Sequence, residues 1–424
     1  LVAVDARSGL SRYRLLETVR DYAWERLEAA IELDRVAEGH ARHFGDLAVR
    51  LGAGLESADE LASCRKAEDD LENFRAAFRW SIDNADADLA NCLMDALMPM
   101  SWLRGTPFGT MTREAAEMPA ATDHPLRAMA LAMVCQALTQ DGAIEEALDF
   151  ADAAEAETER LLGSPEHARL RCRVRGCLST AVALAGQNDR LVSLARRSVQ
   201  DARSNGYRFE VMRFLIMLAS ATQEEERDEA IKAGEEALRL AEEFAVPSYL
   251  AWAPMMLAGR LTESDPTRAE ALLAEAARAA TVADNSFAQF MARIQLASIQ
   301  SARGNYASAA TTLLEQIETS LLGGDRSTTL QAIGALIPVL VQLGDVDTAL
   351  LAGAWAERRG VTPYNEVNPT YLRFHGDTYI SLRDRLTEEQ KRTLSLRASE
   401  LDEAGLLAIA RPSVESIRRN ESSG

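Results

Sequence analysis

Lysine and aromatic residues are scarce in this 424-residue sequence, and several catalytic motifs are missing from it. The only lysines are Lys66, Lys232 and Lys391, and none of them follows a glycine. The Gly-Lys pair of a phosphate-binding P-loop is therefore absent. There is also no G-x-S-x-G, no H-E-x-x-H, and no G-x-G-x-x-G that opens a helix after a strand. We expect this chain to be non-catalytic and to bind no cofactor or metal.

The sequence also lacks a disulfide framework and a hydrophobic run long enough to cross a bilayer. Its five cysteines are odd in number and include no C-x-x-C pair, which fits a reducing compartment. No signal peptide is evident. We therefore expect a cytoplasmic protein with no membrane partner. The sequence begins with Leu1 rather than methionine, and we expect it to be a fragment of a longer protein.

Acidic residues outnumber basic ones, giving a formal net charge of -19 and an isoelectric point near 4.9. A chain with this charge repels polyanions, so direct binding of nucleic acid is not expected. Basic clusters do occur, most densely at Arg169, Arg171, Arg173 and Arg175. At helical spacing these side chains spread over several faces, and we interpret them mainly as a solvated surface.

The feature that organises the chain is a repeat of about forty residues between positions 126 and 361. Aligned on a turn, its units begin at Gly142, Gly186, Glu225, Ser264, Gly304 and Gly344. The residue five positions later is alanine in all but one unit, and the residue twelve positions later is small in all but one. A period of this size is typical of a solenoid of helix pairs, in which small residues let neighbouring helices approach closely.

The turn chemistry favours one class of helix-pair repeat. Gly304-Asn305-Tyr306, followed by Ala309, is similar to the glycine-polar-aromatic turn and following alanine of tetratricopeptide repeats. Repeats of the HEAT class also have periods of roughly forty residues and are the alternative. We predict an all-α fold, a right-handed α-solenoid of tetratricopeptide-like helix pairs. The turns at Glu225 and Ser264 lack glycine, so the central repeats should be the least regular.

The segments that flank the array have their own patterns. Two short apolar runs, residues 1–4 and 11–15, are separated by Asp5–Gly9 and predict a β-hairpin, with a helix from about Glu17 to Ala30. After residue 360 the period stops. A loop over 361–369 and three helices, about 370–384, 387–398 and 400–410, should then close the array. Residues 387–390 carry a capping-box pattern for the second of these helices.

Three strings near the N-terminus share their order and spacing with a known family. They are RYRLLETVRDYA (12–23), GHARHF (39–44) and EDDLENFRAAFRW (68–80). This stretch resembles the winged-helix tail and following helices of actinobacterial STAND-type (NB-ARC) ATPase transcriptional regulators of the LuxR/AfsR-like kind. RASELDEA (397–404) resembles the end of their arrays, whereas 106–119 departs from the family pattern. The resemblance implies an upstream domain that binds ATP or ADP.

On this basis we expect four segments. Residues 1–31 would be the tail of a winged-helix domain and 32–125 a helical linker. Residues 126–361 would form about six tetratricopeptide-like repeats, and 362–424 would form capping helices with a polar tail. His40 and His43, three residues apart on one expected helix, could in principle ligate a metal. They have no third His or Cys nearby, so we interpret that helix as amphipathic.

The function expected from this organisation is binding. The array would be the sensor or protein-interaction region of a multidomain signalling ATPase or transcriptional regulator. A protein, peptide or small-molecule effector would lie on the concave face formed by the first helix of each pair. Candidate contacts are Arg171, Arg175, Arg213, Arg260 and Arg293. Two alternatives remain open: a structural scaffold that self-associates, and the regulatory arm of a protein containing a nucleotide cyclase.

Overall fold

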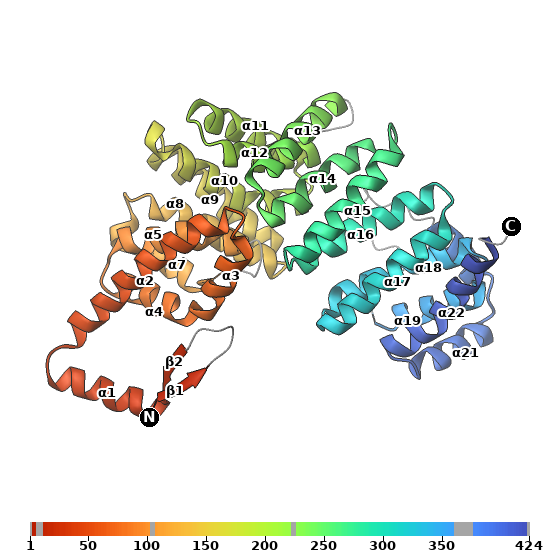
Figure 1. Ribbon diagram of the computed structural model, residues 1–424, viewed down its shortest axis with the longest axis horizontal. Coiled ribbons are helices and arrows are strands. Elements are labelled where there is room, and N and C mark those ends of the chain that lie inside the picture. Colours follow the sequence, from red (N-terminus) through yellow and green to blue (C-terminus); the bar gives the residue numbers. More distant parts are fainter. Residues whose placement is uncertain (1, 6–11, 102–106, 222–225, 360–375, 422–424) are drawn as a thin grey trace. The chain divides into compact units, whose positions relative to one another are not determined.

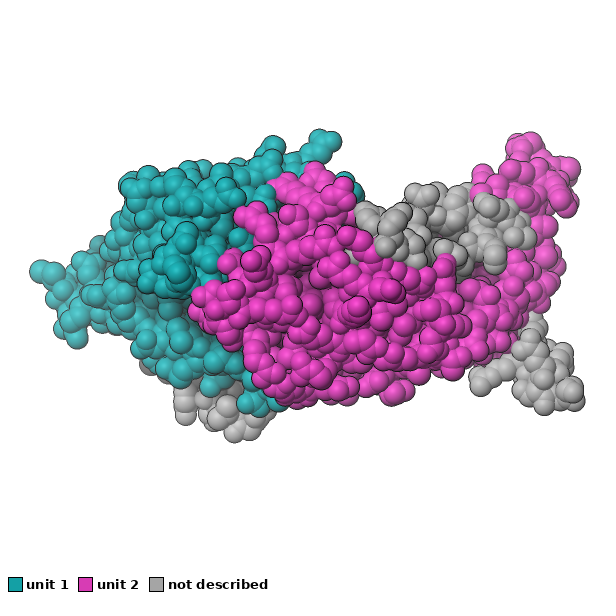
Figure 2. All heavy atoms as spheres, turned by 90° about the horizontal axis from the view of Figure 1, so that it is seen from above, with its two compact units in different colours: residues 1–186 teal, residues 187–424 magenta. Residues whose placement is uncertain are grey.

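The computed structural model describes residues 2–5, 12–101, 107–221, 226–359 and 376–421, and these are mostly helical (Figure 1). The chain divides into two compact units, residues 1–186 and 187–424, coloured separately in Figure 2. This division falls inside the segment predicted to be one array. Unit 1 accordingly contains the first repeats as well as everything that precedes them.

Unit 1 begins with the hairpin predicted from the sequence. Strand β1 (Val2–Asp5) pairs antiparallel with β2 (Arg12–Leu15), so that Val2 lies opposite Leu15. The predicted turn lies largely outside the described residues. Helix α1 (Glu17–Ala29) follows at once, as expected, and none of its residues is buried within the chain.

The rest of unit 1 consists of antiparallel helices joined by short turns. These are α2 (Leu33–Leu55), α3 (Glu60–Asp69), α4 (Leu71–Asp83), α5 (Ala87–Leu97), α7 (Met111–Glu117), α8 (Leu126–Gln140), α9 (Ile144–Leu161) and α10 (Ala168–Leu184), with 3-10 turns η2 (Met98–Met100), η3 (Pro119–Ala121) and η4 (Pro165–His167). Helix α2 packs against α3, α4 and α5, while α8 packs against α7, α9 and α10.

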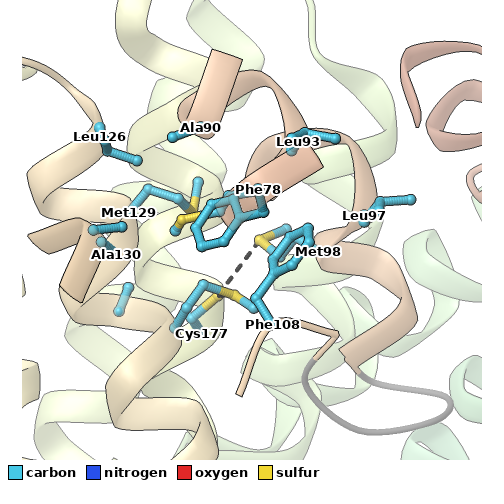
Figure 3. Close-up of a cluster of buried hydrophobic side chains, with 14 of the residues drawn as sticks. Phe78, Ala90, Leu93, Leu97, Met98, Phe108, Leu126, Met129, Ala130 and Cys177 are labelled. Atoms are coloured by element: carbon cyan, nitrogen blue, oxygen red, sulfur yellow. Dashed lines mark hydrogen bonds between the residues drawn. The ribbon is translucent and has the colours of Figure 1, made fainter. Parts of the chain in front are cut away.

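The core of unit 1 is rich in sulfur and aromatic rings (Figure 3). The rings of Phe78 and Phe108 stack with their centroids 4.2 Å apart. The sulfur of Cys177 lies 3.4 Å from that of Met98 and 4.0 Å from that of Met133. Cys135 is fully buried, as the repeat pattern predicted. These soft, polarisable side chains fill the space between α5, α8 and α10 without requiring polar partners.

Unit 2 is a regular succession of helix pairs. Its helices are α11 (Asn188–Ser204), α12 (Arg208–Ala221), α13 (Arg227–Phe244), α14 (Pro247–Leu261), α15 (Pro266–Val282), α16 (Ser286–Ala302), α17 (Tyr306–Gly323), α18 (Arg326–Gln342) and α19 (Val346–Glu357). Each helix packs against the next, and the A helices α12, α14, α16 and α18 also pack against one another in turn. The predicted all-α array of helix pairs is confirmed.

The positions aligned in the sequence are structural ones. The four anchor glycines, Gly142, Gly186, Gly304 and Gly344, have φ angles between 70° and 85°, which only glycine adopts without cost. All six residues five positions after an anchor are buried, from Ala147 to Ala349, and so are all six that follow twelve positions after it. The array is therefore held by close packing of small side chains between paired helices.

A second set of left-handed turns, which the sequence alignment missed, joins each pair of helices to the next. It comprises Gly206, Ala245, Asp284 and Gly324, spaced 39, 39 and 40 residues apart, with φ between 52° and 75°. Only two of the four are glycine, so the period is hidden in the sequence. A left-handed alanine costs about 1 kcal/mol, and the packing around it offsets this cost.

Three helices close unit 2, as predicted: α20 (Gly376–Asp384), α21 (Glu388–Ser399) and α22 (Glu403–Glu421). The capping box is present, with the Thr387 hydroxyl and the Gln390 side chain each accepting a backbone N–H. The prediction that the third helix ends near residue 410 is wrong. Ala410 and Val414 continue its buried stripe, so the helix extends through the segment predicted to be a polar tail. The predicted loop 361–369 lies outside the described residues.

Candidate partner-binding surface

The arginines of α10 serve unit 1 internally. Arg173 is 3% exposed and binds the carboxylates of Glu56 and Asp95, tying α10 to the end of α2 and to α5. Arg175 is also buried. Arg171 donates to the carbonyls of Leu162 and Ser164 at the end of α9. The interpretation of this cluster as a solvated surface is therefore wrong for its buried members. Removing guanidinium groups from water requires the carboxylate and carbonyl partners that α2, α5 and α9 supply.

Two of the other candidate arginines also bind within the chain. Arg213 on α12 pairs with the buried carboxylate of Glu210, one turn earlier, at 2.9 Å. Arg293 on α16 donates to the Thr319 hydroxyl of α17 at 3.0 Å. Burial lowers the pKa of the Arg293 guanidinium, opposed by the charge of Glu315. These contacts position each guanidinium against its own repeat.

Arg260, the fifth candidate, spans two A helices. It lies near the end of α14, is 6% exposed, and donates through Nε to the carbonyl oxygen of Ala219 at 2.5 Å. A second donor reaches the carbonyl of Ser220. Both carbonyls belong to the last described turn of α12, and the final carbonyls of a helix need a partner from outside the helix. The guanidinium therefore caps α12 in the repeat whose anchor, Glu225, is not glycine.

The exposed arginines of unit 2 are largely paired as well. Three bidentate or close salt bridges link the B helices α11, α13 and α15: Arg196 with Glu229 (2.7 Å), Arg203 with Glu236 (2.5 Å), and Arg268 with Glu235 (2.6 Å). In every pair the partners are 33 residues apart. Hydrogen bonds with Glu229 and Glu226 raise the pKa of the Arg196 guanidinium. Little unpaired positive charge is left on this side for an acidic ligand.

The outer surface of the B helices carries one hollow. It has a volume of about 570 Å³ and is lined by α11 and the start of α13, including Arg196, Arg197 and Glu226. Arg196 binds both Glu226 and Glu229 there, so its charge is already neutralised. The hollow is open and polar, without the apolar lining that most ligand sites have.

Aromatic side chains gather at the start of three successive A helices. Phe209 of α12 contacts Tyr249 of α14 edge to face, with centroids 5.3 Å apart, and Phe244 of α13 at 5.4 Å. One helical turn after Tyr249, Trp252 meets Phe287 of α16 at 6.0 Å. We call Phe209, Phe244, Tyr249, Trp252 and Phe287 the aromatic row. The chain has only 24 aromatic residues, so this is a local concentration.

The aromatic row is partly open to solvent. Phe287 is 56% exposed and nearby Val282, at the end of α15, is 71% exposed, whereas the other rings of the row are half-buried. Arg208 lies over the Phe244 ring and binds both oxygens of Glu243, which lowers the pKa of that carboxyl. The row is therefore an apolar strip beside a neutralised ion pair. Half-exposed Trp, Tyr and Phe rings are typical anchors of protein interfaces.

The sequence pattern did not reveal this row. Its members occupy different repeat positions, and only Phe209 and Tyr249 are separated by a full period of forty residues. A search for aromatic residues near the start of each A helix would have found it. It lies in the central repeats, whose anchor positions, Glu225 and Ser264, are not glycine.

The paired histidines on α2 lie against aromatic rings. The His40 ring is 4.6 Å from that of Phe44, and the His43 ring is 5.1 Å from it. Burial lowers the pKa of His40, although a hydrogen bond with Asn73 opposes this effect. Among the described residues, no three His, Cys, Asp or Glu side chains are grouped to hold a metal ion.

Comparison with known proteins gives two similarities. No protein-family model matches the sequence. A stretch of 103 residues, 24% of this chain, is 41% identical to proteins named as HTH-type transcriptional regulators in Mycobacterium bovis and Mycobacterium tuberculosis. The match covers 11% of each of those proteins, so the chain spans about a tenth of their length.

The second similarity is one of fold. It is to a Signal Transduction ATPase with Numerous Domains (STAND) protein with a tetratricopeptide repeat sensor, from Pyrococcus horikoshii. The TM-score is 0.51 at 13% identity, over 79% of this chain and 55% of that one. The fold is therefore that of a tetratricopeptide-like helical repeat. Within the described ranges, every helix is too short or too polar to span a lipid bilayer.

Proposed function

We propose that this chain is the partner-binding sensor region of a multidomain transcriptional regulator. The aromatic row of unit 2 is the observation that carries the proposal. A helix-pair array is a scaffold for recognition, and this one carries large rings where three of its A helices begin, of which Phe287 is exposed and the others are half-buried. The partner is a protein segment with apolar side chains, because the row has little free charge to recognise a charged ligand.

The resemblance seen in the sequence supports a more specific proposal for the whole protein. The whole protein would be a cytoplasmic STAND/NB-ARC ATPase of the LuxR/AfsR-like kind found in actinobacteria, with ATP or ADP bound in an upstream domain. Its effector would bias that domain between resting and active forms. The named HTH-type regulators and the tetratricopeptide sensor of the archaeal STAND protein support this assignment by similarity.

In this proposal the five candidate arginines have different roles. Arg171 and Arg293 remain partly exposed and can contribute a hydrogen bond to a partner at the edge of its contact, whereas the Arg213 side chain is only 9% exposed and pairs with Glu210. Arg175 and Arg260 are buried and contribute by holding the repeats in position. We therefore place the binding energy on the rings rather than on the arginines.

The proposal can be tested with the full chain immobilised and exposed to extract from the source cells. A Trp252→Ala/Phe287→Ala double variant should lose a retained partner, with at least a tenfold drop in affinity once that partner is purified. Leu396→Ala is the matched control, because Leu396 is 62% exposed on α21, in the closing helices rather than in the repeats that carry the row. Equal retention by all three proteins would contradict the proposal.

Self-association through the same row is the second candidate, favoured by the exposure of Phe287 and Val282 on one apolar strip. Sedimentation at several concentrations separates the two candidates. A mass that rises with concentration in the wild type but not in the double variant would show that the partner is another copy of this chain. A monomer at all concentrations would exclude it.

A further inference from the structure

A small cavity lies among the closing helices of unit 2, away from the aromatic row. Its volume is about 120 Å³, and it is enclosed by α19, α20 and α21. Its floor is apolar, with Leu350, Ala354 and Leu394, and the wholly buried Tyr379 forms part of the wall. A cavity of that volume equals the share of about four water molecules and is near the size that holds one benzene ring.

The rim of this cavity is positively charged in an otherwise acidic protein. Arg358, Arg383 and Lys391 line it, against the single carboxylate of Glu357. Arg383 binds Glu357 at 3.0 Å, and Lys391 binds Glu388 at 2.9 Å. These two cations are thus already paired within the protein.

Arg358 differs from both of them. Its NH1 donates to the hydroxyl of Ser395 at 3.1 Å, and among the described residues it has no carboxylate partner. The planar guanidinium can donate further hydrogen bonds to a carboxylate. The apolar residues beside it can contact a compact apolar group on the same ligand. The hydroxyl of Ser395, which also lines the cavity, holds the guanidinium there.

We propose that this cavity binds a small monocarboxylate with a compact apolar tail. The carboxylate pairs with Arg358, and the tail lies on Leu350, Ala354 and Leu394. The site joins the end of the repeats (α19) to the closing helices (α20 and α21), so an occupant would stabilise that junction. The proposal does not depend on partner binding by the aromatic row.

The test uses the full chain, titrated with benzoate, acetate and the neutral analogue benzamide by calorimetry. Benzoate should bind saturably. Acetate and benzamide should both bind at least tenfold more weakly, because acetate lacks the apolar ring and benzamide lacks the negative charge. Arg358→Gln should weaken benzoate binding about tenfold or more. Arg392→Gln, which removes an exposed charge from α21 outside the cavity, should leave it unchanged.

A second variant keeps the result interpretable. Ala354→Leu places a larger side chain on the floor and should abolish benzoate binding while circular dichroism shows the same helix content. Absence of saturable benzoate binding to the wild type would overturn the proposal. Equal losses in Arg358→Gln and Arg392→Gln would also overturn it, because they would show a general charge effect. Equal affinity for acetate and benzoate would show that the apolar floor does not contribute to binding, which would contradict the proposal.

Discussion

Replacing Arg260 with methionine tests whether this arginine supports the repeat or receives a ligand. Methionine keeps most of the apolar stem but removes the two hydrogen bonds to the carbonyls of Ala219 and Ser220. A hydrogen bond from a charged donor contributes about 1.5–3 kcal/mol, which sets a ceiling of about 6 kcal/mol for the two. The last turn of α12 can be partly rehydrated, so we expect a loss of about 3 kcal/mol in the free energy of unfolding.

The measurement is urea unfolding of the full chain, together with hydrogen exchange of peptides from α12. Exchange matters because two units of this size need not unfold in one step. Arg239→Met is the control: Arg239 is 62% exposed and makes one salt bridge with Glu243, at 3.6 Å and four residues along the same helix. Such a pair contributes less than about 0.5 kcal/mol. If the two variants lose equal stability, with no faster exchange in α12, the capping role of Arg260 is wrong.

Three further predictions concern other parts of the chain. Gly353→Ala should destabilise unit 2 by about 1–3 kcal/mol, because the new Cβ would lie 1.8 Å from the Tyr379 hydroxyl oxygen; a melting curve checks this. Arg173→Met should cost about 2–3 kcal/mol in urea unfolding, because Glu56 loses its hydrogen bond from this buried guanidinium but keeps its salt bridge with Arg169. The lowered pKa of His40 means that the unfolded chain binds its proton more readily than the folded chain. Stability should therefore fall as the pH drops through 6.5, the ordinary value, towards the lowered pKa. A His40→Gln variant should flatten this part of the stability profile, and an unchanged slope would rule His40 out as its source.

The repeat could be predicted from the sequence because its requirements are strict at a few positions. A left-handed turn after an A helix favours glycine, and the buried position five residues later holds alanine in five of the six repeats, with Leu191 in the other. Where a different interaction takes the place of the glycine, the repeat is harder to recognise in the sequence. After α14 the chain turns without a left-handed residue, and Asp265 caps α15 by accepting from the Arg268 N–H at 3.0 Å. Ala245 and Asp284 adopt left-handed angles that their identities do not indicate.

The roles of the arginines could not be predicted, because a guanidinium is equally compatible with solvent, a carboxylate and a helix end. Whether Arg173 is buried depends on Glu56 and Asp95, which lie 117 and 78 residues away in the sequence. No local pattern contains that information. The aromatic row was missed for a related reason: its rings meet across successive helix pairs, and the contact between Trp252 and Phe287 joins residues at different positions of the repeat.

Residues that recur in every repeat and residues found in only one repeat have different roles in binding. Positions that recur in every repeat, such as Ala230 and Ala309, are buried and hold the helices together, so they cannot distinguish one partner from another. Specificity must come from positions at which one repeat departs from the others. The central repeats depart twice, by gathering aromatic rings and by the Arg260 guanidinium, which binds the carbonyls of the last described turn of α12. If the cap also sets the spacing of α12 and α14, Arg260→Met should weaken partner binding through the row, although Arg260 does not touch the rings.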